Sequence, residues 1–304
     1  MAQFQLNILG CGSAIPTARH NPSSQILDIR DNLFMIDCGE GAQLMMRKMR
    51  LKYSRLNHIF ISHLHGDHCL GLIGLLSSMA LQGKTGTVTI HIFEDGARLF
   101  EEQLKFFCRD TPFEIKFNII KPERALILET GAITVETFPL FHRVPCVGFL
   151  FKERPKLRHL KGDMVKFYNI PIKELHSIKE GNDFVTDEGI IVPNAHLTTD
   201  PSPEISYAYC SDTAFNPQVA EMVKGTNTIY HEATYTSEFA HLARPRGHST
   251  SVEAARIAQM AGAKRLVLGH FSKRFRDESP IINEAKEIFP NTILANDGMQ
   301  IDLL

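Results

Sequence analysis

The six residues His63 to His68 spell HLHGDH and place three histidines and an aspartate on one short stretch. Imidazole nitrogens and carboxylate oxygens are the donors that zinc takes in proteins, and they also suit manganese and iron. The stretch follows the apolar run IFIS at 59–62, so these side chains stand where a strand ends and a turn begins. Gly66 permits the tight backbone path of such a turn. With this spacing, the side chains can diverge toward two neighbouring metal positions.

One six-residue motif cannot saturate two metals, and three further candidates end other apolar runs. His142 ends AITVETFPLFH, Asp212 ends ISYAYCSD and His270 ends KRLVLGH. In many α/β proteins the carboxyl ends of strands carry the chemistry. A single histidine at a strand end is usually structural or simply exposed. Together with HLHGDH, however, the three residues predict a two-metal site.

The elements that must position these side chains alternate short apolar runs with helical spacing. Mixed strands and helices in two similar halves favour a layered α/β sandwich. Strands are predicted at 4–10, 23–29, 33–37, 56–62, 88–93, 113–120, 132–142, 147–153, 205–212, 226–232 and 264–270. Helices are predicted at 42–50, 71–82, 97–107, 216–225, 251–263 and 281–289, and strands are predicted to follow the last helix and close the chain.

The composition is ordinary for a soluble globular protein, with 43% hydrophobic and 22% charged residues in 304. No apolar run approaches the ~20 residues that span a membrane, and no signal peptide is expected. The six cysteines form no CxxC pair and are expected to be reduced cytosolic thiols, mostly buried. The net charge of −1 gives no global attraction to nucleic acid, although a local basic patch suffices to contact phosphates.

The pattern changes over residues 153–203, which are rich in Lys, Pro, Gly and Asn and lack long strand runs. We interpret this stretch as an insertion within a single domain that spans residues 1–304. One or two short helices are expected in it, around 164–170 and 172–180.

The chain resembles the metallo-β-lactamase superfamily and, within it, the ribonuclease Z family of tRNA 3′-processing endonucleases. The superfamily resemblance rests on HLHGDH with His142, Asp212 and His270. HxHxDH alone is shared by many hydrolases, whereas DCGEG, HEAT and GHST in their correct places are much more specific. The narrower resemblance rests on segments spread in order over almost the whole chain: GCGSAIPT, HNPSSQ, IDCGEGAQLMMRK, FHRVPCVGF, YCSDT, YHEATY, RGHSTS and LGHFSKR.

The resemblance implies a four-layer αββα sandwich with a protruding arm and two zinc ions per subunit. Two metals ~3.5–4 Å apart can bridge a hydroxide, lower its pKa and clamp both oxygens of an in-line phosphoryl displacement. The resemblance assigns one zinc to His63, His65 and His142, the other to Asp67, His68 and His270, and the bridging position to Asp212.

Three residues are candidates for the chemical step. Asp67 is expected to orient or deprotonate the attacking water, or else to be a ligand only. His248 in GHST and Glu232 in HEAT could protonate the leaving oxygen, because a histidine oriented by a carboxylate is a common acid device. Alternatively, Glu232 supports a ligand or caps a helix, and His248 is a loop histidine. His231 would point to the opposite face of a continuing strand, and we leave it out of the site.

Other polar residues in or near these motifs each have two possible roles. Asp37 and Glu40 in DCGEG could hydrogen-bond the ligating histidines, or could serve the turn alone. Lys273, Arg274 and Arg276, which follow His270, could meet phosphates, or could form a solvated charge run.

Within the insertion, residues 169–184 stand where many family members carry an arm with a GKLK-like basic segment that grips the tRNA elbow. Lys173 and Lys179 are the candidate RNA contacts, but Glu174 and Glu180 stand beside them. The segment is therefore expected to bind tRNA, with a dimer-packing or surface hairpin as the alternative.

These residues and the resemblance imply a zinc-dependent endoribonuclease that removes 3′ trailers from precursor tRNA and leaves a 3′-hydroxyl on the tRNA. The resemblance also implies a cytoplasmic homodimer, in which one subunit's arm presents tRNA to the other's active site. One rival is another hydrolase of the superfamily that acts on a small phosphodiester, sulfate ester, lactam or thioester. A second rival is a non-catalytic RNA-binding protein with a structural metal pair.

Overall fold

The computed structural model describes residues 4–303, which divide into two compact units. The larger unit comprises the chain up to Lys152 and from Ile205 onward, and the smaller unit comprises Glu153–Glu204. Each unit encloses buried apolar residues of its own. Among the described residues, no helix has the length and apolar character needed to cross a bilayer.

The first sheet of the larger unit comprises β1 (Phe4–Gly10), β2 (Ser24–Ile29), β3 (Asn32–Cys38), β4 (Leu56–Phe60), β5 (Thr87–Ile92), β6 (Glu114–Ile119) and β18 (Gln300–Asp302). In the described chain its order is β18-β1-β2-β3-β4-β5-β6. The strands from β18 to β3 pair antiparallel, while those from β3 to β6 pair parallel. Parallel neighbours need long crossover connections, and helices α1 (Ala42–Lys48), α3 (Leu72–Leu81) and α4 (Glu94–Phe107) lie in them.

The second sheet comprises β7 (Ala125–Glu129), β8 (Ile133–Leu140), β9 (Cys146–Glu153), β14 (Ser206–Cys210), β15 (Thr228–Glu232), β16 (Arg265–Gly269) and β17 (Thr292–Leu294). Its order is β17-β16-β15-β14-β9-β8-β7 over the described residues. The four strands from β14 to β17 are parallel, and α8 (Gln218–Met222), α10 (Ser251–Ala261) and α11 (Ser279–Ile288) lie in their crossovers. Each sheet therefore combines an antiparallel part with a parallel part.

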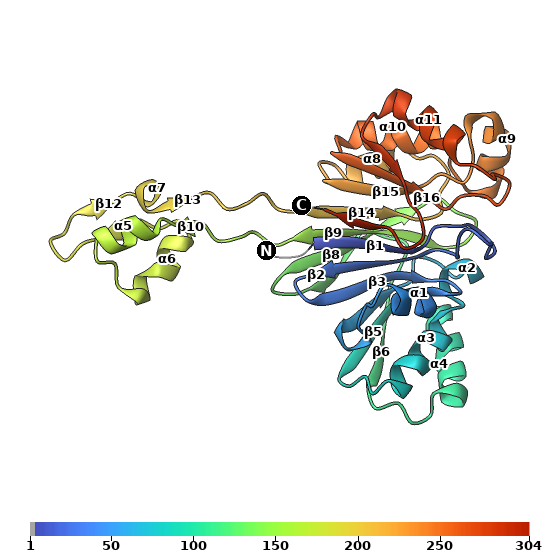
Figure 1. The fold of residues 1–304 in the computed structure, drawn as a ribbon, viewed down its shortest axis with the longest axis horizontal. Coiled ribbons are helices and arrows are strands. Elements are labelled where there is room, and N and C mark those ends of the chain that lie inside the picture. Colours follow the sequence, from blue (N-terminus) through green and yellow to red (C-terminus); the bar gives the residue numbers. More distant parts are fainter. Residues whose placement is uncertain (1–3, 304) are drawn as a thin grey trace. The chain divides into compact units, whose positions relative to one another are not determined.

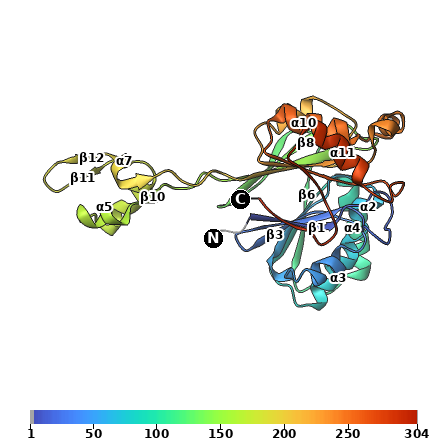
Figure 2. The same ribbon diagram turned by 45° about the horizontal axis from the view of Figure 1, so that its top comes forward.

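The two sheets face each other, and a layer of helices covers the outer face of each (Figure 1 and Figure 2). Aromatic side chains meet between the sheets. The ring centroids of Phe34 and Phe151 lie 6.3 Å apart, and those of Phe60 and Phe149 lie 5.4 Å apart. A second apolar cluster fills the space between the first sheet and its helices. The predicted αββα sandwich is confirmed.

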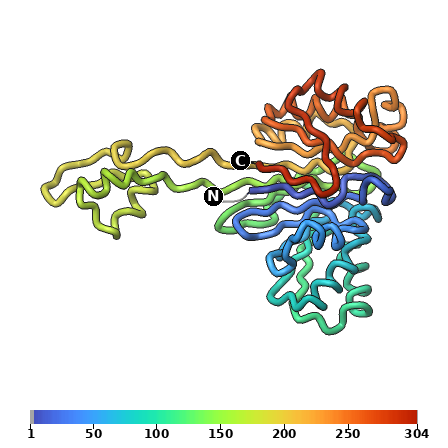
Figure 3. The backbone as a smooth tube through the Cα atoms, in the orientation of Figure 1, coloured from blue at the N-terminus to red at the C-terminus, as the bar shows by residue number. Residues whose placement is uncertain are grey.

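The tube in Figure 3 follows the chain through the smaller unit. Its helical segments are α5 (Gly162–Phe167), η2 (Ile172–Glu174), α6 (Leu175–Lys179) and α7 (Asn194–Leu197). Two short strand pairs accompany them: β10 (His159–Leu160) with β13 (Thr198–Thr199), and β11 (Phe184–Val185) with β12 (Ile191–Val192). The unit's small core consists of Ile170, Ile178, Phe184, Val192 and Leu197. The short helices expected around 164–170 and 172–180 are present, whereas the four two-residue strands were not predicted.

The structure also differs from the sequence prediction in a few elements of the larger unit. Strand β7 was missed, because it is short and only half-buried. Helix α4 begins at Glu94 rather than at residue 97, and the acidic Glu94 and Asp95 in its first turn favour this earlier start by complementing the helix dipole. The remaining short helical segments are α2 (Gly66–Cys69), α9 (Ala240–Ala243), η1 (Tyr53–Arg55), η3 (Ser237–Phe239) and η4 (Arg244–Arg246).

Candidate dinuclear metal centre

The predicted ligands converge from the ends of four strands in the two sheets. HLHGDH follows β4 and runs into α2, while His142 follows β8. Asp212 comes two residues after β14, and His270 directly follows β16. The two sheets thus bring together side chains that are up to 207 residues apart in sequence, and these side chains form two groups of potential ligand atoms.

The first group contains His63, His65, His142 and Asp212. Nδ1 of His65 lies 3.1 Å from Nε2 of His63 and 3.1 Å from Nε2 of His142. The Oδ2 atom of Asp212 lies 3.6 Å from Nε2 of His63 and 3.8 Å from Nε2 of His142. Ligand atoms ~2.0–2.2 Å from a tetrahedral ion lie roughly 3.3–3.6 Å from one another. One zinc-sized ion therefore fits among these four atoms.

The second group contains Asp67, His68 and His270, with the other oxygen of Asp212. The Nε2 atoms of His68 and His270 are 3.4 Å apart. The Oδ2 atom of Asp67 lies 3.6 Å and 3.5 Å from these two nitrogens. Asp212 Oδ1 lies 3.4 Å and 3.2 Å from the same two nitrogens. Asp212 thus presents one oxygen to each group, which is the arrangement of a bridging ligand.

Hydrogen bonds on the far ring nitrogen orient four of the five imidazoles. A metal-ligating histidine ordinarily donates its other N–H to a carboxylate, carbonyl or hydroxyl, and this bond fixes its tautomer. The partners here are Asp37 Oδ2 for His68 (2.7 Å), Ser62 Oγ for His63 (3.0 Å), the Gly247 carbonyl for His142 (2.8 Å) and Thr234 Oγ1 for His270 (2.9 Å). In each case the bond leaves Nε2 free to face the cluster.

Asp37 is the centre of this supporting network. It is the second-last residue of β3, fully buried and at a left-handed φ of 55°. Its carboxylate accepts hydrogen bonds from His68 Nδ1, from the Ser62 N–H (2.7 Å) and hydroxyl (2.9 Å), and from the Tyr209 hydroxyl (2.7 Å). Of the two interpretations of the DCGEG acids, Asp37 therefore bonds His68, a predicted ligand, whereas Glu40 is exposed on the turn.

One buried oxygen of Asp212 indicates that these side chains fit a bound metal ion. Asp212 Oδ1 is buried and has no hydrogen-bond partner among the described residues. A buried carboxylate oxygen without a partner is costly, and a cation at this position would satisfy it. All the donors are nitrogen or oxygen, which suits zinc, manganese or iron. The residues present thus fit a pair of divalent ions.

Glu232 and His248 form a buried pair beside the cluster. The Nδ1 atom of His248 lies 2.9 Å from Glu232 Oε1 and 4.0 Å from Asp212 Oδ2. Burial lowers the pKa of His248, but the charge and hydrogen bond of the Glu232 carboxylate outweigh burial and raise it to about 9. Burial raises the pKa of Glu232, but His248 outweighs that effect and holds the pKa below its ordinary value.

Backbone groups hold Glu232 in place. Its carboxylate also accepts hydrogen bonds from the N–H groups of Thr213 (3.1 Å), Thr234 (3.0 Å) and Ser249 (3.0 Å). Next to Ser249, Thr250 starts α10 with a capping box, in which its side chain and the Glu253 carboxylate each bond the other residue's N–H. The GHST segment is therefore fixed at both ends. His231, by contrast, bonds the main-chain carbonyl of Glu232 and takes no part in the cluster.

Asp67 faces both the cluster and the loop that follows β1. Its Oδ2 accepts a hydrogen bond of 2.7 Å from the N–H of Ala14, a residue with a left-handed φ of 65°. Burial raises the pKa of Asp67, but the hydrogen bond to His270 and the charge of His68 outweigh it and hold the pKa below its ordinary value. The carboxylate is therefore ionised, as a metal ligand must be.

A cavity of about 550 Å³ opens beside His248 and is rimmed by cations. Lys273 and Arg274, which the sequence proposed as phosphate contacts, line it. Sequence reasoning missed Arg143 and Arg246, which also line it, although each stands within two residues of a site histidine in FHRVPC and RGHST. Arg246 donates to the Tyr235 hydroxyl (2.7 Å), and this bond holds its guanidinium at the rim.

The other two candidate substrate contacts belong to the smaller unit. Lys173 is exposed and lies 3.9 Å from the carboxylate of its neighbour Glu174. Lys179 is half-buried at the end of α6. The unit as a whole carries seven Lys and Arg residues against nine Asp and Glu residues, so it presents no general excess of positive charge.

Comparison with known proteins gave both family and fold relatives. A family model described as Anti-Pycsar protein Apyc1 matches residues 4–165. Proteins named Ribonuclease Z from Parabacteroides distasonis and Bacteroides thetaiotaomicron are each 49% identical over 304 residues; the match covers all of this chain and 100% and 96% of theirs. The solved structure of the short form of human tRNase Z is similar with a TM-score of 0.70, 23% identity and 99% coverage of both chains. The last likeness is one of fold alone.

Proposed function

Because the chain belongs to the ribonuclease Z family, we propose that it is a metal-dependent endoribonuclease that removes the 3′ trailer from precursor tRNA. Over residues 4–165 it also belongs to the family described as Anti-Pycsar protein Apyc1. The observation that carries the proposal is the convergence of six ligand side chains on a seventh, Asp212, with the Glu232–His248 pair beside them.

The proposed cofactor is a pair of zinc ions per chain. The first would be held by His63, His65 and His142, the second by Asp67, His68 and His270, and Asp212 would bridge them. When bound, two such ions supply a water of lowered pKa and charge stabilisation for both oxygens of an in-line displacement. The donor chemistry and the unpartnered Asp212 oxygen support this assignment.

His248 is the proposed general acid. Hydrolysis that leaves a 3′-hydroxyl on the tRNA breaks the bond between phosphorus and the 3′ oxygen, and the oxygen of water joins the phosphorus. The departing 3′ oxygen then needs a proton. His248 can deliver it from Nε2, because Glu232 holds Nδ1 and keeps the imidazole protonated. Glu232 does not meet the substrate in this scheme and acts by orienting and charging His248.

Asp67 is assigned to holding the metal and orienting the attacking water. Its hydrogen bond from Ala14 and its lowered pKa support this choice, since a carboxylate of low pKa is a weak proton acceptor. Of the two expectations for Asp67, we therefore favour orientation of the water over its deprotonation.

The basic rim and the smaller unit are the proposed contacts for tRNA. Arg143, Arg246, Lys273 and Arg274 would meet phosphates near the scissile bond. The smaller unit would contact the body of the tRNA through individual exposed side chains such as Lys173, since its total charge gives little attraction. A homodimer in the cytoplasm is part of the same proposal, and the six free thiols are consistent with a reducing compartment.

The test is to incubate purified, metal-loaded protein with a 3′-extended tRNA and to map the cut. We expect one cut that leaves a 3′-hydroxyl on the tRNA. Bis(p-nitrophenyl) phosphate is assayed on the same preparation, and activity on this small ester alone would favour a hydrolase of small phosphodiesters. Binding of tRNA without turnover by a fully metal-loaded preparation would favour a non-catalytic RNA-binding protein.

A further inference from the structure

A second set of side chains that could hold a metal ion lies outside the candidate dinuclear centre. Cys11 follows β1, His20 lies in the loop before β2, and Asp297 lies between β17 and β18. Cys11 Sγ lies 3.3 Å from His20 Nδ1 and 3.4 Å from Asp297 Oδ1, and the last two atoms are 3.5 Å apart. The three atoms thus form a nearly equilateral triangle. Cys11 is completely buried and His20 is 7% exposed.

We propose that Cys11, His20 and Asp297 bind a further zinc-class ion that is separate from the dinuclear centre. Around tetrahedral zinc, with sulfur at ~2.3 Å and nitrogen or oxygen at ~2.0–2.2 Å, neighbouring ligand atoms lie roughly 3.3–3.6 Å apart. The three observed distances match this range without movement of any side chain. The Ala295 carbonyl oxygen, 3.6 Å from the same sulfur, is a candidate for the fourth position.

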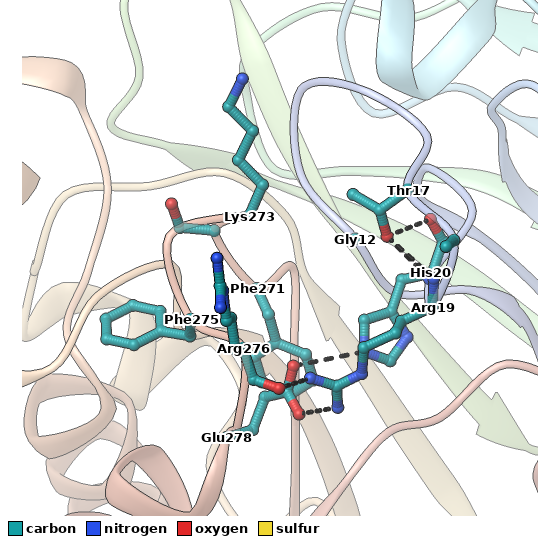
Figure 4. A pocket seen from close by; sticks show the side chains of 11 residues that line it. Gly12, Thr17, Arg19, His20, Phe271, Lys273, Phe275, Arg276 and Glu278 are labelled. Atoms are coloured by element: carbon teal, nitrogen blue, oxygen red, sulfur yellow. Dashed lines mark hydrogen bonds and ion pairs between the residues drawn. The ribbon is translucent and has the colours of Figure 1, made fainter.

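The atoms of His20 and Asp297 that point away from the triangle have polar partners, as those of metal ligands ordinarily do. Nε2 of His20 lies 3.4 Å from Glu278 Oε1, and Figure 4 shows these side chains together with Arg19, which also pairs with Glu278. The other oxygen of Asp297 accepts from the N–H (2.7 Å) and side-chain amide (2.9 Å) of Asn21. Such contacts fix the imidazole and carboxylate orientations, and they tighten metal binding by limiting the freedom of the ligands.

The site joins distant parts of the chain beside the dinuclear centre. Cys11 and Asp297 are separated by 286 positions. The loop that begins at Cys11 carries Ala14, whose N–H donates to Asp67. The same loop bonds the segment after His270, because Ser13 N donates to Phe271 O (3.1 Å) and Phe271 N donates to Cys11 O (3.0 Å). An ion bound here would fix the start of the loop that contacts Asp67 and would therefore have a structural role.

Cobalt substitution tests the proposal on the whole protein. The dinuclear centre has only nitrogen and oxygen donors, so a thiolate-to-cobalt charge-transfer band reports on a sulfur-containing site alone. The chelated protein is titrated with Co²⁺. We expect the protein to bind about three equivalents of Co²⁺, because two sites are proposed at the dinuclear centre and one here. We also expect a thiolate-to-cobalt charge-transfer band. Cys11→Ser should abolish the band and lose one equivalent, while two equivalents remain.

Cys69→Ser is the matched control, because Cys69 is also buried and its sulfur contacts the main-chain carbonyl of His65 without belonging to either proposed site. This variant should keep the band and all the cobalt. His20→Gln should lose the same equivalent as Cys11→Ser, and it serves if the latter fails to fold. Absence of the band in the unaltered protein, or its persistence in Cys11→Ser, would show that the three side chains are only hydrogen-bonded to one another. None of these readouts involves RNA cleavage, so the result stands apart from the proposed activity.

Discussion

Glu232 Oε1 lies 2.9 Å from Nδ1 of His248, and neither oxygen of this fully buried carboxylate is left without hydrogen-bond donors. A buried ionised carboxylate in contact with an imidazole stabilises the imidazolium form. The pair thus holds a proton beside the predicted metal ligands at neutral pH.

His248→Ala should slow the chemical step while leaving metal content and tRNA binding unchanged. General acid–base catalysis ordinarily contributes roughly 10²–10⁴-fold, and we expect a loss in this range for single-turnover cleavage of precursor tRNA. His241→Ala, at an exposed histidine of α9, is the control. Near-normal single-turnover cleavage by His248→Ala would exclude the residue as the acid.

The rate of cleavage should fall as the pH rises through the pKa of His248, which stands at about 9 without bound ions. The rate falls with rising pH because only the protonated imidazole of His248 can donate a proton to the leaving oxygen. Glu232→Gln removes the charge that raises this pKa, and the alkaline limb should therefore move to lower pH. Bound cations lower the pKa in both proteins, so the measured quantity is the displacement between the two single-turnover profiles. Coincident profiles would contradict the pairing.

The same pair gives a stability prediction. The folded-state pKa of His248 is raised above its value of ~6.5 in the unfolded chain. The stabilisation is therefore complete below about pH 6.5 and is lost as the pH rises through the folded pKa. Thermal unfolding of the metal-free protein should show a smaller loss of stability between pH 7 and pH 10 in Glu232→Gln than in the unaltered protein. Equal losses would show that the pair does not account for the pH dependence.

His65→Ala and His270→Ala should lower metal content and activity together, one in each group of ligands. Nδ1 of His65 lies 3.1 Å from Nε2 of His63, and Nε2 of His270 lies 3.2 Å from Oδ1 of Asp212. Such distances are short enough for the atoms of each pair to bind the same ion. Elemental analysis of the purified proteins checks this, with His176→Ala, an exposed histidine of the smaller unit, as the control. Full metal retention in both variants would refute the assignment.

Asp37→Asn should weaken metal binding although Asp37 touches no ion. The carboxylate fixes His68 through a 2.7 Å hydrogen bond, and loss of such a supporting partner typically costs 10–100-fold in metal affinity. Competition with a chelator of known affinity measures the effect. Tyr209→Phe removes a different hydrogen bond to the same carboxylate and should change metal affinity much less. Equal affinities for Asp37→Asn and the unaltered protein would contradict the role.

Removal of the smaller unit should impair tRNA cleavage and spare hydrolysis of a small ester. Strands β9 and β14 are antiparallel neighbours, and Lys152 pairs directly with Ser206, so a short turn can replace residues 153–204 and keep the buried Ile205. The cut must include the whole unit, because replacing 169–184 alone would remove Ile170, Ile178 and Phe184 from its core. We expect a higher KM for precursor tRNA, with hydrolysis of bis(p-nitrophenyl) phosphate unchanged. Intact tRNA processing would show that the unit does not recognise the substrate.

The sequence by itself determined the ligand types and most of the elements that carry them. HLHGDH is local, and its strand-to-turn setting is visible in the run that precedes it. His142, Asp212 and His270 were found because each ends an apolar run, and parallel strands of a layered fold end at one edge. Element boundaries were less accurate, and β7 was missed, because a short half-buried strand has a weak periodic signal.

Only the tertiary structure decided how these side chains meet. It set which ring nitrogen faces the cluster, gave Asp212 one oxygen for each group, and joined Glu232 to His248. It also brought Cys11 and Asp297 together across 286 positions. No local pattern encodes such contacts, because they depend on the packing of two sheets and on strand pairs as distant in sequence as β1 and β18. Spacing along a strand fixes the direction of a side chain, whereas the distance between strand ends is fixed by pairing and layer packing.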